Sequence, residues 1–241
     1  MMAENTDGRK YKLIYYNVRG LAEPVRWMFK MAKVEFEDKR IPVENWQEEK
    51  HRFEKQMGRL PILCVDDKIE LTQVASITQF VAKQLGFNGE TEMDAARADE
   101  VHELLYDLRL YAANHLKSEK GPSDPDIFPH TVFRNVCNEA NLSKKVLMKR
   151  SLLYIFPKYL DKINDVLQQS PGEYLAGQRI TYADLAFTNF IDICEEMINP
   201  DLLNDYPCLR DLKEEILDIP EIREWMEHCS TKSFYPPTVA A

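Results

Sequence analysis

Apolar residues in the first part of the chain switch between alternating and helical spacing. The run Tyr11–Tyr16 is aromatic and β-branched, which favours a strand that ends at Asn17-Val18-Arg19-Gly20. Residues 21–33 then carry apolar side chains at helical spacing, with Pro24 acceptable in the first turn. A second short strand is expected within residues 36–43. The pattern therefore predicts a strand, a helix and a strand in succession.

A second group of elements follows a polar segment that contains Trp46. Ile62–Val65 and Ile69–Leu71 form two short apolar runs separated by the turn candidate Asp66-Asp67, which predicts a β-hairpin. Helical spacing takes over near Thr72-Gln73. A βαβ unit followed by a ββα unit makes a compact α/β layer of about 80 residues in thioredoxin-like order.

The position after the first strand indicates which chemistry this layer can perform. A redox thioredoxin would carry a Cys-x-x-Cys motif there, whereas this chain has Tyr15-Tyr16-Asn17-Val18. Disulfide exchange at this site is therefore excluded. A platform that binds thiol peptides can remain.

The pattern beyond Gly89 is helical. Helical spacing of apolar residues predicts two long helices, over residues 91–116 and 143–169. Two further helices are expected after them, marked by Pro207 and Pro220. The breaker-rich stretch 121–129 predicts a loop between the long helices. A domain boundary is expected near Gly89, with an all-helical C-terminal part.

A helix start is marked most clearly around Thr181. Thr181 is an N-cap candidate, and Asp184 three residues later is placed to accept a hydrogen bond from its backbone N–H, as in a short capping box. Ile180 can pack on Leu185 across the cap. We interpret this pattern as structural and expect a buried helix from Tyr182 to about Met197.

Composition narrows the class of protein. The chain has 241 residues, 44% of them hydrophobic and 29% charged, which is ordinary for a globular protein. A formal net charge of -9 argues against nonspecific binding to nucleic acid or to acidic membranes. Residues 1–10 are polar and lack the apolar stretch of a signal peptide, and no later run approaches the roughly 18 apolar residues of a membrane helix, so a cytoplasmic protein is expected.

Cysteine and histidine usage gives no indication of a disulfide framework or a metal site. The five cysteines are odd in number and widely spaced without a Cys-x-x-Cys pair, which fits reduced thiols. The five histidines are equally scattered. We therefore expect no bound metal.

The hairpin and the helix after it offer two features that suit a small acidic peptide. Pro61 precedes the first hairpin strand, where the Leu60-Pro61 bond can be cis and the backbone of Leu60 can pair with an extended peptide. The N-terminus of the helix near Gln73 has free N–H groups and a positive dipole end, which suit a carboxylate. The alternative is that Pro61 only shapes a turn and Thr72 only caps a helix.

Taken together, four stretches and one tryptophan carry a family resemblance. They are Y-K-L-I-Y-Y-N-V-R-G-L-A-E-P-V-R from Tyr11, then Trp46, R-L-P-I-L-C-V-D-D from Arg59, L-T-Q-V-A-S-I from Leu71 and Y-L-A-G-Q-R-I-T-Y-A-D-L from Tyr174. The chain resembles a cytosolic glutathione transferase of the sigma type. The resemblance implies a thioredoxin-like glutathione-binding domain over residues 11–88 and an all-helical domain over residues 91–230 that shapes the electrophile pocket. It also implies glutathione as co-substrate and, usually, a homodimer.

By this resemblance Tyr15 is the catalytic residue. A free thiol has a pKa of roughly 8.5, and a phenol O–H that donates to the sulfur favours the thiolate. Tyr15 would then lower the pKa of the glutathione thiol and position the sulfur for attack. The alternative is that Tyr15 fills the strand like any tyrosine; Tyr16 points to the opposite face and is expected to be the ordinary one of the pair.

Other glutathione contacts follow from the resemblance alone. Trp46 and Lys50 match residues that hold the glycine end, and Arg59 and Leu60 match the segment before the cis-proline. Gln73 and Val74 fall where the γ-glutamyl end lies on a helix N-terminus. Asp99 matches an acidic residue that reaches the glutathione of the partner subunit.

Several positions depart from the family pattern. Val74 replaces a serine and removes a hydroxyl contact worth on the order of 1.5–3 kcal/mol. Leu21 stands where prostaglandin D synthases of this class have an arginine beside the thiol, which argues against a specific prostaglandin isomerase. Gln79 stands where an arginine often contributes to the dimer contact. The segment of about residues 121–141 looks like an insertion and is similar to that of S-crystallins, lens proteins of this class with little activity.

Two functions therefore stay open. The first is a transferase that conjugates the glutathione thiolate to small hydrophobic electrophiles, with peroxidase or isomerase activity as a possible addition. The second is a structural or ligand-holding protein of the S-crystallin type. Intact Tyr15, Trp46, Gln73 and Leu60-Pro61 favour the enzyme, and the departures favour the alternative.

Overall fold

The chain folds into two compact units in the computed structural model, which describes residues 8–115 and 142–228. The sheet unit contains the described residues up to Asn88 together with those from Asp218 onward. The helical unit contains the described residues from Gly89 to Leu217. The last helix thus joins the sheet unit, whereas the division into domains at 11–88 and 91–230 stays a prediction.

The sheet unit has the expected βαβ and ββα order, and the fold class is confirmed as a thioredoxin-like domain followed by a helical one. Its elements are β1 (Tyr11–Tyr16), α1 (Glu23–Met31), β2 (Phe36–Ile41), α2 (Trp46–Glu49), β3 (Ile62–Val65), β4 (Ile69–Thr72), α3 (Val74–Leu85) and, from the end of the chain, α9 (Pro220–His228). Short 3₁₀ turns at Gly20–Ala22, Val43–Asn45 and Lys50–Gln56 link them.

The four strands form one mixed sheet in the order β2-β1-β3-β4. Strand β1 runs parallel to β2 and antiparallel to β3, and β3 pairs antiparallel with β4. The hairpin turn has positive φ at both Asp66 (54°) and Asp67 (56°), which matches the turn that the sequence predicts there.

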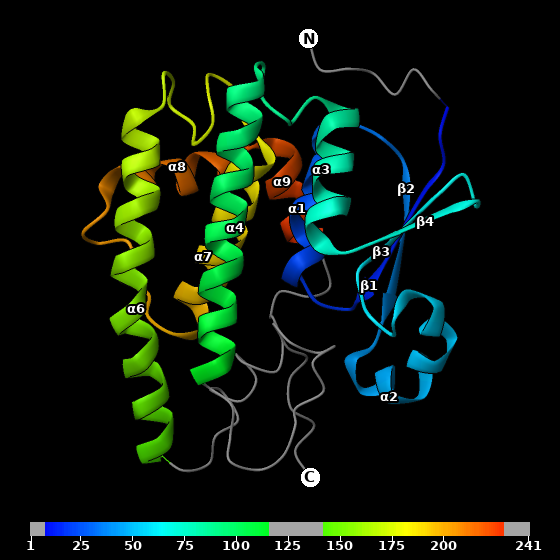
Figure 1. Cartoon of the computed structure of the whole chain (residues 1–241), viewed down its shortest axis with the longest axis horizontal. Helices are drawn as coiled ribbons and strands as arrows, with labels where there is room; N and C mark the ends of the chain where they lie inside the picture. The colour runs from blue at the N-terminus through cyan, green and yellow to red at the C-terminus, as the bar shows by residue number, and fades with distance from the viewer. Residues whose placement is uncertain (1–7, 116–141, 229–241) are drawn as a thin grey trace. The chain divides into compact units, whose positions relative to one another are not determined.

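Helix α1 forms the centre of this unit. Every residue of α1 except Lys30 is buried, including the charged Glu23 and Arg26. Helices α3 and α9 both pack against α1, and Figure 1 shows α1 and α3 beside the sheet. A helix with charged residues inside such a core must provide partners for them.

Two boundaries differ slightly from the prediction. Helix α3 begins at Val74, because Thr72 still pairs with Ile62 in the sheet and Gln73 turns the chain with a φ of 72°. Strand β2 ends at Ile41, since Pro42 has no N–H to continue the ladder.

The helical unit consists of long helices that pack on one another. They are α4 (Glu92–His115), α6 (Leu142–Gln169), α7 (Tyr182–Met197) and α8 (Pro207–Asp218), and α4 packs against both α6 and α7. The capping box at Thr181 and Asp184 is present as predicted. The expected loop at 121–129 and the insertion at 121–141 lie outside the described residues. Among the described helices, none combines the length and apolar character that a bilayer span requires.

Candidate functional site

The sheet register brings three chain segments to one end of the sheet. Ile14 of β1 pairs with Ile62, the first residue of β3, and Ile62 pairs with Thr72, the last residue of β4. The residues that follow or precede these positions therefore gather at the same end. Tyr15, the Leu60-Pro61 step and the Gln73-Val74 step all lie there.

Tyr15 is held firmly at this end. Its side chain is only 1% exposed, and its phenol oxygen accepts a hydrogen bond from the backbone N–H of Leu21 at 3.2 Å. A phenol oxygen that accepts a hydrogen bond remains a donor through its own proton. Tyr16 is equally buried and its ring lies 5.2 Å from that of Tyr15, so burial does not separate the two tyrosines.

Trp46 connects the α2 segment to the same region. It is fully buried, its ring meets Tyr16 edge-on at 5.2 Å and it stacks on Phe53 at 5.8 Å. Its indole Nε1 is buried and has no hydrogen-bond partner among the described residues. An indole N–H of this kind is available to a ligand oxygen.

The peptide bond between Leu60 and Pro61 is cis, in agreement with the prediction. Leu60 is buried and lies beyond the last pair of the β1-β3 ladder. Arg59 beside it is exposed, and Lys50, at the end of α2, is half-buried. These two cations flank the segment from α2 to β3.

The N-terminus of α3 follows directly from β4. Gln73 occupies the N-cap position, and its side chain makes no capping hydrogen bond. The first backbone N–H groups of α3 are therefore not capped by the side chain of Gln73. Val74, the first residue of the helix, is half-buried.

Asp99 belongs to a different part of the molecule. It lies on α4 of the helical unit, where its carboxylate accepts a hydrogen bond from the hydroxyl of Tyr182 on α7. The other predicted site residues all lie in the sheet unit.

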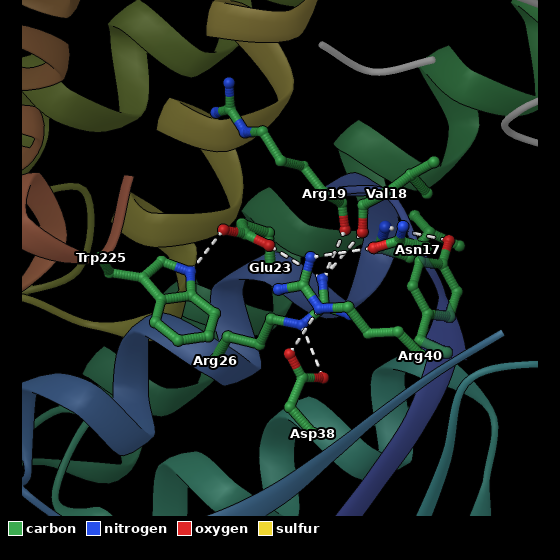
Figure 2. A network of polar contacts seen from close by, with 10 residues as sticks. Asn17, Val18, Arg19, Glu23, Arg26, Asp38, Arg40 and Trp225 are labelled. Atoms are coloured by element: carbon green, nitrogen blue, oxygen red, sulfur yellow. Dashed lines mark hydrogen bonds and ion pairs between the residues drawn. The ribbon is translucent and has the colours of Figure 1, made fainter. Parts of the chain in front are cut away.

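A buried polar network next to Tyr15 was not found from the sequence. Figure 2 shows Arg26, Asp38 and Arg40 pointing toward one another, with Glu23 and Trp225 on the other side of Arg26. The available signal was the pair Glu23 and Arg26, spaced three residues apart within an otherwise apolar helix. Trp225 carried no such signal, because it is distant in sequence.

No group of three or more metal-binding side chains occurs within residues 8–115 and 142–228. The site offers several hydrogen-bond donors. These are the phenol of Tyr15, the indole of Trp46, the cations Lys50 and Arg59 and the backbone N–H groups at the start of α3.

Comparison with known proteins gives the class first. Residues 11–83 match the glutathione S-transferase N-terminal domain, and residues 126–228 match the glutathione S-transferase C-terminal domain. Glutathione S-transferase 3 of Caenorhabditis elegans is 32% identical, over 90% of this chain and 95% of its own length. The glutathione S-transferase of Ascaris lumbricoides has a crystal structure that matches with a TM-score of 0.78 at 29% identity, covering 94% of this chain and 100% of its own.

A lens protein is also among the relatives. S-crystallin 4 of Enteroctopus dofleini is 26% identical, over 93% of this chain and 99% of its own length. Together these matches show that the chain belongs to the glutathione S-transferase family, whose enzymes use glutathione as co-substrate.

Proposed function

We propose that this transferase conjugates glutathione to small hydrophobic electrophiles, with Tyr15 as the residue that acts on the thiol. The observation that carries the proposal is the convergence at one end of the sheet. The register of β1, β3 and β4 gathers Tyr15, the backbone before Pro61 and the N-terminus of α3 within reach of one small peptide.

The chemistry would proceed through a thiolate. The Leu21 N–H holds the phenol oxygen of Tyr15, which orients its O–H. A hydrogen bond from this O–H to the glutathione sulfur favours the ionised thiol and lowers its pKa. The thiolate then attacks the electrophilic carbon, the leaving group departs with its electron pair, and the thiol proton goes to solvent.

The two ends of glutathione would be held by opposite parts of the site. The N–H groups at the start of α3, with Gln73 and Val74, would bind the γ-glutamyl carboxylate, which the helix dipole favours. The indole N–H of Trp46, which has no hydrogen-bond partner in the described ranges, and the ammonium of Lys50 would bind the glycine carboxylate. Leu60 would pair with the cysteinyl backbone, with Arg59 beside it.

Finer assignments remain part of the proposal. A sigma-type transferase is supported by the similarity to an S-crystallin. A homodimer, in which Asp99 reaches the partner's glutathione, and a cytoplasmic location follow from the family resemblance. The electrophile is represented in the experiment by a generic aryl halide.

The test compares native protein with Tyr15→Phe in steady-state conjugation at several glutathione concentrations. Loss of the phenol O–H should lower kcat by about a hundredfold or more, the usual cost of removing one positioned hydrogen-bond donor to a charged reacting atom. Binding of S-methylglutathione, which has no thiol proton, should change little. Tyr16→Phe is the matched control, because it removes the neighbouring buried hydroxyl, and it should keep most of the rate.

A structural or ligand-holding function is the second candidate, and Val74 is the observation that favours it. A serine at this position would add a hydroxyl at the helix start, and its absence weakens the site for the γ-glutamyl carboxylate. Retention on a glutathione-affinity column together with turnover supports the transferase. Failure to bind, with equally slow native and Tyr15→Phe proteins, would instead support the second candidate.

A further inference from the structure

The network next to Tyr15 contains four charged side chains, those of Glu23, Arg26, Asp38 and Arg40. Arg26 is fully buried; its Nε donates to Asp38 Oδ1 at 3.1 Å and its Nη1 donates to Glu23 Oε2 at 2.9 Å. Asp38 uses its second oxygen to accept from Nε of Arg40 at 2.7 Å. Two arginines and two carboxylates balance one another, so the cluster carries no net charge into the core.

The same arginine also holds the turn between β1 and α1. Nη1 of Arg26 donates to the backbone carbonyls of Val18 at 2.8 Å and Arg19 at 3.3 Å, and Figure 2 shows both oxygens directed at the guanidinium. Arg40 reaches the side-chain oxygen of Asn17 at 3.5 Å. The turn is thus tied to side chains from α1 and β2.

This turn delivers the backbone donor to Tyr15. The Leu21 N–H, two residues after the carbonyl of Arg19, donates to the phenol oxygen. The guanidinium carbon of Arg26 also lies 5.8 Å from the centre of the Tyr15 ring, within the range of a cation–π interaction. Arg26 is therefore linked to Tyr15 both through the turn and through the ring.

We propose that Arg26 is a positioning residue for Tyr15, which fixes the Leu21 N–H on the phenol and thereby sets the direction of the phenol proton. This inference rests on the proposed role of Tyr15. Arg26 touches neither glutathione nor the electrophile in this scheme; it acts through the turn. Leu21 supplies only a backbone N–H, so the aliphatic side chain at this position is compatible with the scheme.

The network around Arg26 also includes a residue of α9. Nε1 of Trp225 on α9 donates to Glu23 Oε1 at 2.8 Å, while Glu23 Oε2 accepts from Arg26. The side chain of Glu23 is fully buried, so water cannot replace these hydrogen-bond partners. The indole therefore orients the carboxylate that orients Arg26.

A purely structural ion pair is the alternative. Breaking a buried ion pair strongly destabilises a protein, whatever its function. A loss of stability therefore does not distinguish a positioning role of Arg26 from a purely structural one. The pH profile of conjugation does distinguish them. A positioning role changes how strongly the phenol favours the thiolate, and a structural role does not.

The first variant is Arg26→Lys, which keeps the positive charge but loses the planar fork that bridges Asp38, Glu23 and the carbonyls. The measured quantity is the pH dependence of kcat/KM for the aryl halide at saturating glutathione, which reports the pKa of the enzyme-bound thiol. We expect the apparent pKa of the bound thiol to rise by about one unit. At pH values below the native pKa, the variant would then hold about a tenth of the thiolate that the native protein holds. Binding of S-methylglutathione should be unchanged.

The second variant, Trp225→Phe, keeps the ring but removes the indole N–H from Glu23. Its apparent thiol pKa should rise in the same direction by a smaller amount. Trp27→Phe is the matched control, because Trp27 is a neighbour of Arg26 on α1 whose buried Nε1 has no hydrogen-bond partner in the described part of the chain. It should leave the pH profile at the native position, even if it lowers stability. If Arg26→Lys does not fold, Trp225→Phe decides the question.

A double variant separates failure of this inference from failure of the proposed function. If Arg26 acts through Tyr15, adding Arg26→Lys to Tyr15→Phe produces no further shift of the pH profile. If Tyr15→Phe alone leaves the thiol pKa unchanged, the proposed function is wrong. If Tyr15→Phe shifts the profile while Arg26→Lys and Trp225→Phe do not, only the positioning role is overturned.

Discussion

At the scale of single residues, His102 is a buried ionisable group on α4 with an unsatisfied ring nitrogen. It is 4% exposed, its Nδ1 has no hydrogen-bond partner among the described residues, and a carboxylate oxygen of Glu103 lies 3.6 Å from this nitrogen. Burial, followed by the nearby charge of Arg109, lowers the pKa of His102 to about 4, against a smaller opposing effect of Asp99. The imidazole is therefore neutral in the folded protein at neutral pH.

His102 should make the protein sensitive to acid. Between pH 6.5 and about 4, His102 binds a proton in the unfolded chain but stays neutral in the folded protein. The free energy of unfolding therefore falls as the pH falls through this window. The full effect is about 3 kcal/mol, complete near pH 4. Urea unfolding of native protein and His102→Val at several pH values should show curves that diverge as pH falls, with the variant less sensitive to acid.

The exposed His228 on α9 provides the control for this experiment. His228→Val should run parallel to the native protein across the same pH range. Parallel curves for His102→Val as well would mean that His102 binds its proton equally well in the folded and unfolded states, contrary to the prediction.

At the scale of elements, two helix starts use the same Thr-x-x-Asp pattern in different surroundings. At α7 the carboxylate of Asp184 is fully buried and accepts from the N–H and the hydroxyl of Thr181, at 2.7 and 2.8 Å, and from the N–H of Leu175 at 2.8 Å. At α4 the partly exposed Asp94 accepts from the N–H groups of Glu90 and Thr91, at 3.0 and 2.9 Å. The pair isolates the effect of burial on one capping motif.

Removing the two carboxylates should therefore have unequal effects. Asp94→Ala loses an exposed cap, which costs about 1 kcal/mol because water replaces the carboxylate. Asp184→Ala leaves buried donors unsatisfied and should cost on the order of 3 kcal/mol or more. Chemical unfolding at pH 8 measures both, since burial raises the pKa of Asp184 only to about 6 and the group is ionised there. Equal losses would contradict the argument.

Local patterns explain why most of the fold could be predicted. The hairpin around Asp66-Asp67 and the helix start at Thr181 are specified by neighbouring residues, so the sequence indicates them directly. The Arg26 network could not be predicted, because its members lie on α1, β2 and α9 and meet only after folding. The roles of the other predicted site residues stay predictions, since the structure shows where they lie and no ligand contact.

At the scale of the whole molecule, the connectivity of the two units couples their stabilities. The sheet unit needs α9, which follows the helical unit in the chain. If the helical unit unfolds alone, α9 is tethered by a flexible segment of more than a hundred residues, and closing such a loop costs about 5 kcal/mol on a chain-entropy model. This is a large fraction of the stability of a typical protein. We therefore expect the two units to unfold together.

The three tryptophans allow this coupling to be tested, because Trp27, Trp46 and Trp225 all lie in the sheet unit. Tryptophan fluorescence then reports the sheet unit, and far-ultraviolet circular dichroism reports mainly the long helices of the helical unit. S-methylglutathione at a hundred times its Kd should stabilise the protein by about 2.7 kcal/mol and move both urea transitions together. S-methyl-cysteinylglycine, which lacks the γ-glutamyl carboxylate proposed to bind at α3, should move neither. A shift seen by fluorescence alone would show that the units unfold independently and that the return of α9 to the sheet does not couple them.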